Sequence, residues 1–213
     1  MDKRLIAGVL VFGSLWGFSE VIIGTGLQNA NLPYGAIMTG CFAISFLVLS
    51  RMIFRRPGMQ LGMGIVAGGL RVFNPFVGCH LCSAIAIMAE AAIFEVIWYK
   101  ISSDFSDLKT ITMQSSMGVA TAYLVYVGGY ITTQILTPIV GGVGFYLENL
   151  IIFMPRILAS GLLPAILGAA VLPVILQVRK LDFTIKDRLY YPAALGLTLL
   201  CWVGVIGFSV ILG

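Results

Sequence analysis

The chain has 213 residues, of which 59% are hydrophobic and only 10% charged, and its formal net charge is +4. A mean hydropathy of +1.01 leaves too little polar surface to coat a water-soluble domain of this size, so a soluble protein is excluded. The interleaved basic and aromatic residues typical of nucleic-acid binding are absent, so nucleic acid is not an expected partner. We expect a single all-α domain, residues 1–213: a polytopic bundle of six to seven transmembrane helices in the cell (plasma) membrane.

Seven apolar stretches follow one another along the chain, and all but the third approach the ~20 residues that cross ~30 Å of hydrocarbon. The third is bounded by Pro57-Gly58 and Asn74-Pro75, because proline interrupts a helix and disfavours helix in the residue before it. The last stretch is an additional helix beside a core bundle of about 5–180. The expected spans are 5–27, 34–54, 59–73, 77–99, 112–136, 157–178 and 190–212.

Basic residues mark alternate ends of these stretches. Eleven of the thirteen Lys and Arg residues fall in segments that would share one side of the membrane, namely 3–4, 51–56, 100–109 and 179–188. Because cytoplasmic loops carry an excess of Lys and Arg, we expect the N-terminus to be cytoplasmic. Seven crossings would then place Gly213 outside.

Small residues recur at four-residue spacing in two early spans. Gly13 and Gly17 lie in the first span, and Gly58, Gly62, Gly64 and Gly68 lie in or next to the third. Such spacing lets a second backbone approach closely in lipid. The strip on the first span therefore predicts either packing inside the bundle or docking of a second membrane subunit.

The two remaining cations, Arg71 and Arg156, lie at the opposite ends of their helices. Glu20 is about sixteen residues into the first span, ~24 Å from the cytoplasmic end, where a lone carboxylate would be costly. Opposite charges at one depth favour a shared pocket, although ion pairs that only lock helix ends would look the same. The other polar residues expected in this outer layer are Asn74, His80 and Glu148.

The fourth span carries its own polar stripe. Cys79, Ser83 and Glu90 are spaced so that their side chains point to one side of a helix, with Glu90 near mid-membrane. An ionisable group at that depth is a functional candidate, as a ligand contact, a proton acceptor or a partner for a cation. Glu95 lies nearer the cytoplasm, where we expect it to pair with Lys100.

The spacing Cys79-His80-Leu81-Cys82 permits two alternatives. The two thiols could form a redox pair that passes electrons to a quinone, with Cys41 or Cys201 as a relay, which would make the protein a membrane thiol/quinone oxidoreductase. Alternatively Cys79, His80 and Cys82 could bind haem or a soft transition metal. Three such neighbours on one helix cannot all reach one ion unless the helix unwinds locally.

Other enzyme motifs are missing. The chain has one histidine, no Gly-x-Ser-x-Gly and no phosphate-binding loop, so we do not expect an enzyme or a resident cofactor outside the cysteine alternatives. Any active transport would draw its energy from another subunit or from an ion gradient.

The chain resembles a known family. Its size, its glycine-rich early spans and the segment Met-Ala-Glu-Ala-Ala-Ile-Phe-Glu at 88–95 are similar to the membrane-embedded S components of energy-coupling factor transporters, over about residues 5–180. The resemblance implies a small-molecule ligand near the outer face, and docking of the first helix, through Gly13 and Gly17, on a transmembrane coupling subunit served by ATPases. The chain departs from the family in its last span and lacks the His-rich amino terminus of the cobalt and nickel subunits.

These observations combine into one prediction. The chain captures a small, vitamin-like or cofactor-like molecule from the outer side, and a separate ATP-hydrolysing module drives its release. The two arginines suggest a ligand with an anionic group, and segment 138–155 is expected to be a loop long enough to act as a lid. The predicted substrate-binding residues are Glu20, Arg71, Asn74, Cys79, His80, Ser83, Glu90, Glu148 and Arg156.

Overall fold

A computed structural model describes residues 3–74, 79–101, 104–142, 147–178 and 187–212, and within these ranges the regular structure is entirely helical. The order of elements is α1 (Lys3–Asn29), α2 (Tyr34–Ile37), the π-helical turn η1 (Met38–Ala43), α3 (Ile44–Phe54), α4 (Met59–Arg71), α5 (His80–Val96), η2 (Ile97–Ile101), η3 (Phe105–Asp107), α6 (Ile111–Val140), α7 (Leu147–Ser160), α8 (Leu162–Val178) and α9 (Asp187–Leu212).

Six helical segments are long and apolar enough to cross a membrane, which confirms the all-α polytopic bundle. They are Lys3–Asn29, Tyr34–Phe54, His80–Tyr99, Ile111–Val140, Glu148–Gln177 and Tyr190–Ile211. The predicted span 59–73 is the exception. It forms α4, whose 13 residues rise only ~20 Å and cannot cross ~30 Å of hydrocarbon alone. Its start follows Gly58, which has a left-handed φ of 87°.

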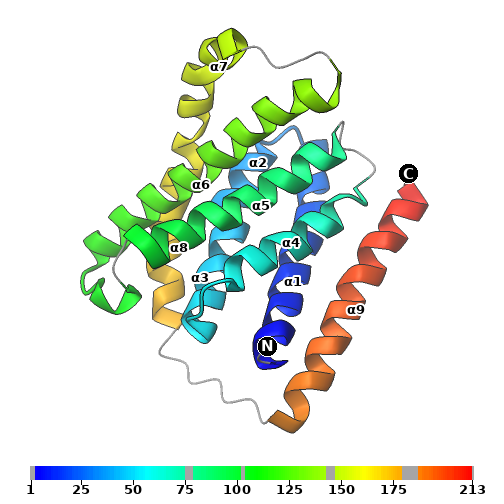
Figure 1. Ribbon diagram of the computed structural model, residues 1–213. Helices are drawn as coiled ribbons and strands as arrows, with labels where there is room; N and C mark the ends of the chain where they lie inside the picture. The colour runs from blue at the N-terminus through cyan, green and yellow to red at the C-terminus, as the bar shows by residue number, and fades with distance from the viewer. Residues whose placement is uncertain (1–2, 75–78, 102–103, 143–146, 179–186, 213) are drawn as a thin grey trace.

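The helices run back and forth between two ends of the bundle (Figure 1). The amino ends of α1, α6 and α9 and the carboxyl end of α3 lie at the lower side of this view, so the basic segments that begin or end these helices gather there. Although α4 is short, it leads from this side toward the other, and the two termini therefore lie at opposite ends. Which of the two ends is cytoplasmic stays a prediction from the distribution of Lys and Arg.

Small residues let α1 and α4 pack closely. A Cβ on Gly13 would lie 2.7 Å from Val66 Cβ, and one on Gly17 would lie 2.8 Å from Leu70 Cβ. Both glycines are buried inside the chain. This close contact with α4 is the internal packing that the spacing allowed, whereas docking of a second subunit through these glycines stays a prediction.

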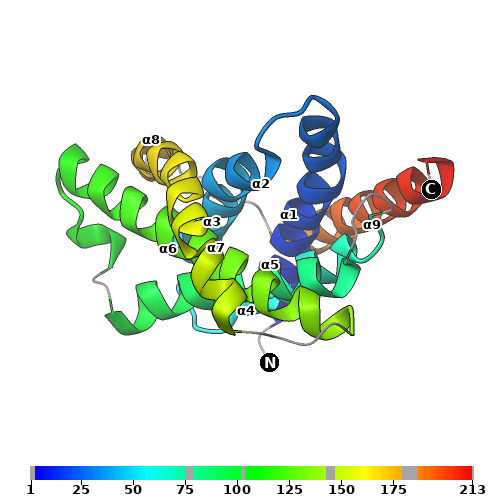
Figure 2. The same cartoon turned by 90° about the horizontal axis from the view of Figure 1, so that it is seen from above.

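The core lies between α1, α3, α4, α5, α6 and α8, where Trp16, Leu47, Met63 and Phe94 are fully buried. Helix α9 stands apart at one edge, beside α1, and α6 lies at the opposite edge (Figure 2). Trp202 on α9 donates its indole N–H to Ser14 Oγ at 3.1 Å. The last helix is thus attached to the bundle mainly through α1.

The predicted pair of Glu95 with Lys100 falls on a side chain outside the described residues and stays a prediction. The Glu95 carboxylate accepts hydrogen bonds from the backbone N–H groups of Gly58, at 2.6 Å, and Leu61, at 3.0 Å. These are the donors left open at the start of α4, so Glu95 caps that helix from α5.

The prediction of a lid loop at 138–155 is wrong for most of that segment, because the structure places helix there. Helix α6 continues to Val140 and α7 begins at Leu147, while residues 143–146 lie outside the described residues. Pro138 and Pro155 sit inside these helices. The apolar residues that flank both prolines favour helix in lipid, where unpaired backbone groups are costly.

Candidate functional site

The helix ends opposite the basic segments enclose a cavity of about 900 Å³, a size typical of small-molecule sites. Its wall comes from α1, α2, η1, α4, α5, α6 and α7. Six of the nine predicted substrate-binding residues lie on it: Glu20, Arg71, Cys79, Ser83, Glu90 and Arg156. The structure thus brings the charged residues Glu20, Arg71, Glu90 and Arg156 to one cavity wall, whereas their role in binding a substrate stays a prediction.

Arg71 joins three helices at one side of the cavity. It is the last residue of α4 and is only 4% exposed. Its Nε donates to Ser83 Oγ on α5 at 3.0 Å, and a terminal nitrogen donates to the backbone oxygen of Glu20 on α1 at 2.6 Å. The Glu20 carboxylate accepts a hydrogen bond from Trp16 Nε1, one turn earlier, at 3.3 Å. These bonds hold the side chain of Arg71 in a fixed position.

Glu90, on α5, lies in the cavity wall and is 8% exposed. Its Oε1 accepts a hydrogen bond from Thr39 Oγ1, in η1, at 3.0 Å. Its Oε2 is buried and has no hydrogen-bond partner within the described part of the chain. Gly129 of α6 lies against it, since a Cβ there would come within 2.7 Å of Glu90 Cγ. An incompletely bonded carboxylate is thus held in the cavity wall.

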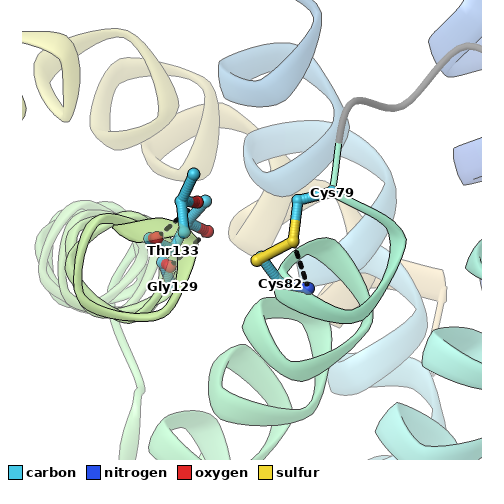
Figure 3. The surroundings of a disulfide bond; sticks show 5 residues. Cys79, Cys82, Gly129 and Thr133 are labelled. Carbon is cyan, nitrogen blue, oxygen red and sulfur yellow. Dashed lines mark hydrogen bonds between the residues drawn. A yellow bond between two sulfur atoms is a disulfide. The ribbon is translucent and has the colours of Figure 1, made fainter. Parts of the chain in front are cut away.

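Cys79 and Cys82 form a disulfide bond at the start of α5. Cys79 is the N-cap residue, and its Sγ accepts a hydrogen bond from the Cys82 backbone N–H at 3.2 Å. The disulfide faces the part of α6 that carries Gly129 and Thr133 (Figure 3). Both cysteines contribute to the cavity wall.

The alternative metal or haem set is not assembled. The two thiols are bonded to each other, and His80 is half-buried, with an Nδ1 that has no hydrogen-bond partner in the described chain. No group of three or more His, Cys, Asp or Glu side chains in the described ranges is placed to hold a metal ion. The predicted relay cysteines, Cys41 and Cys201, are free thiols on η1 and α9. Cys79, His80 and Cys82 lie within a single turn, so they could reach one ion only if the chain unwound there. Helix α5 is regular from His80 onward.

Three predicted residues lie outside the cavity wall. Asn74 is buried and donates to Thr25 Oγ1 at 3.4 Å, so it braces the end of α1. His80 is on α5 but does not line the cavity. Glu148 is exposed in the first turn of α7, where its charge complements the helix dipole.

Most of the cavity wall contributed by α6 was not predicted from the sequence. Tyr126, Tyr130, Thr133 and Thr137 lie along one face of that helix and line the cavity. Their spacing of four, three and four residues within an apolar helix was a readable signal for a polar stripe. Thr39 had no such signal, because its contact with Glu90 joins residues 51 positions apart.

Comparison of the chain with protein families, with curated proteins and with solved structures found no match. The fold defines a multi-pass helical membrane protein. Any proposal about its function therefore has to be argued from the cavity and the residues that line it.

Proposed function

We propose that the chain is the membrane-embedded substrate-capture subunit of an uptake transporter for a small molecule of vitamin or cofactor size, located in the plasma membrane. The observation that carries the proposal is the cavity of about 900 Å³, into which charged side chains from four different helices converge. Buried charges are expensive in lipid and are retained chiefly at ligand or ion sites.

The position of the cavity supports capture from outside. It lies at the helix ends opposite the basic segments, which the distribution of Lys and Arg assigns to the extracytoplasmic side. Arg71 and Arg156 provide donors for an anionic group on the solute, with Arg156 exposed on α7. The sequence has no nucleotide-binding segment, so release to the cytoplasm would depend on a coupling subunit and ATPases. We therefore expect a partner module in the native membrane.

A matched pair of tryptophan variants tests capture. Ala86 lines the cavity, whereas the preceding residue on α5, Ile85, is an exposed side chain outside it. Each protein is purified from native membranes and then denatured on purpose, so that bound small molecules are released. The released molecules are identified by mass spectrometry. We expect a molecule that is present in wild type and in Ile85→Trp but lost in Ala86→Trp. Its absence from wild type, or equal recovery from both variants, would refute capture.

The partner module is tested separately. A tagged chain is isolated from native membranes in mild detergent, and the accompanying proteins are identified. We expect an ATPase and a second membrane subunit to co-purify. Isolation of the chain alone, under conditions in which the cavity ligand is retained, would leave capture standing and remove the ATP-dependent mechanism.

The second candidate function is a membrane thiol/quinone oxidoreductase, which is favoured by one observation, the Cys79–Cys82 disulfide in the cavity wall. The double variant Cys79→Ser with Cys82→Ser separates the two functions. We expect it to retain the ligand of the wild type, because serine is close to cysteine in size and leaves the charged residues of the cavity in place. If this variant lost the ligand while Arg71→Ala retained it, the oxidoreductase would be favoured over the substrate-capture subunit.

A further inference from the structure

The cavity wall contains a buried acceptor for which the described chain supplies no donor. Thr39 satisfies Glu90 Oε1, but Oε2 is buried with no hydrogen-bond partner in the described chain. An ionised carboxylate only accepts hydrogen bonds, and the strongest bonds it accepts come from cationic N–H groups. A cationic donor on a ligand would both favour the ionised form of Glu90 and complete its hydrogen bonding.

The protein's own cation at this depth is engaged elsewhere. Arg71 directs its Nε to Ser83 and a terminal nitrogen to the backbone of Glu20. Glu20 is a second buried acid in the same cavity wall. Among the described buried residues of the cavity, two acids thus face one base, since Arg156 is exposed at the rim. One positive charge from a ligand would balance this layer.

An aromatic wall lies beside the same carboxylate. Tyr126 and Tyr130 are one turn apart on α6, with ring centroids 5.9 Å apart in an edge-to-face arrangement, and both line the cavity. Gly129, between them in sequence, contacts Glu90 and has no side chain to separate the carboxylate from the rings. The faces of aromatic rings attract cations, and the attraction grows where water is excluded.

We infer that the cavity selects solutes that carry a protonated nitrogen, an amine or a basic heterocycle, which is bound by Glu90 and flanked by Tyr126 and Tyr130. The inference rests on the proposed capture function and names the chemical class of its substrate. The ligand nitrogen donates to the Glu90 carboxylate, which lies in the cavity wall, and its charge is offset by that carboxylate and the two rings. An anionic group on the same solute would lie toward the arginine side.

Three probes of similar shape test this inference: benzylammonium, benzyl alcohol and benzoate. Their affinities for the purified full chain in detergent are measured by saturation-transfer NMR, with empty micelles and Ala86→Trp as controls for partitioning. We expect benzylammonium to bind more tightly than the other two. Glu90→Gln should weaken benzylammonium at least tenfold and change benzyl alcohol less than twofold.

Matched variants separate a binding role from a folding role. Glu148→Gln removes an equal charge from the exposed face of α7 and should leave benzylammonium binding unchanged. Tyr126→Phe keeps the ring and should preserve binding within about threefold, whereas Tyr126→Leu should weaken it more. The thermal unfolding of each variant shows that it is folded.

Equal binding of benzylammonium by wild type and Glu90→Gln, or a preference for benzoate, would overturn the inference. So would a failure of all three probes to bind. The mass-spectrometry experiment described under the proposed function shows whether only the inferred substrate class is wrong or whether the capture function is wrong as well. A native ligand that is recovered from wild type and lost in Ala86→Trp, but has no basic nitrogen, refutes the substrate class and leaves capture intact.

Discussion

A double-mutant cycle measures the energetic contribution of the hydrogen bond between Arg71 and Ser83. The variants are Arg71→Met, which keeps an unbranched apolar chain, Ser83→Ala, and the two combined. In water-soluble proteins a hydrogen bond to a charged group contributes about 1.5–3 kcal/mol. In a membrane the unfolded reference state also finds polar partners, and measured couplings are about 0.6 kcal/mol on average and about 1.7 kcal/mol at most. Since the bond is 3.0 Å long and Arg71 is buried, we expect a coupling of about 1 kcal/mol.

The assay is equilibrium unfolding in mixed detergent micelles, followed by circular dichroism. Leu81, an exposed residue of α5 two positions before Ser83, supplies the matched control, so a cycle of Arg71→Met with Leu81→Ala should give no coupling. If the Ser83 cycle and the Leu81 cycle give the same value, the bond does not join α4 to α5 energetically. The account of the cavity wall as a fixed frame around the ligand would then fail.

Two further predictions concern packing and capping. Glu95→Ala should lower stability by about 0.5–2 kcal/mol and speed hydrogen exchange at the Leu61 amide, because it removes the cap of α4; unchanged exchange would contradict the cap. Gly17→Ala should destabilise by about 1–3 kcal/mol, since its Cβ would meet Leu70 Cβ at 2.8 Å, whereas Gly26→Ala on the same helix, with open space around it, should be neutral or stabilising. Equal melting temperatures of the two glycine variants would argue against close α1–α4 packing.

The spans could be read from the sequence because lipid imposes local rules. Each crossing must satisfy its own backbone hydrogen bonds and present apolar side chains, so length and hydropathy over ~20 residues are sufficient evidence for a helix. Glu20 and Arg71 could be placed at one depth by counting residues from helix ends, since the rise per residue is constant. Even the shortness of α4 was visible from its flanking glycine and prolines.

Tertiary packing determines which helix faces meet. The contacts between helices could therefore not be predicted from the sequence. The spacing of Gly13 and Gly17 indicates a close neighbour but cannot say whether it is α4 or another subunit. Glu95 could pair with Lys100 within its own helix, yet it caps α4, because only the fold brings those amides within reach.

The same reason separates the predicted part of the cavity from the part that was missed. Depth along the membrane normal is a one-dimensional quantity that the sequence determines, and it brought together Glu20, Arg71 and Arg156. Rotation of each helix about its axis depends on all of its neighbours at once. It turned Glu90 toward Thr39 and Gly129 and left one carboxylate oxygen without a donor among the described residues, which is the observation behind the inferred class of ligand.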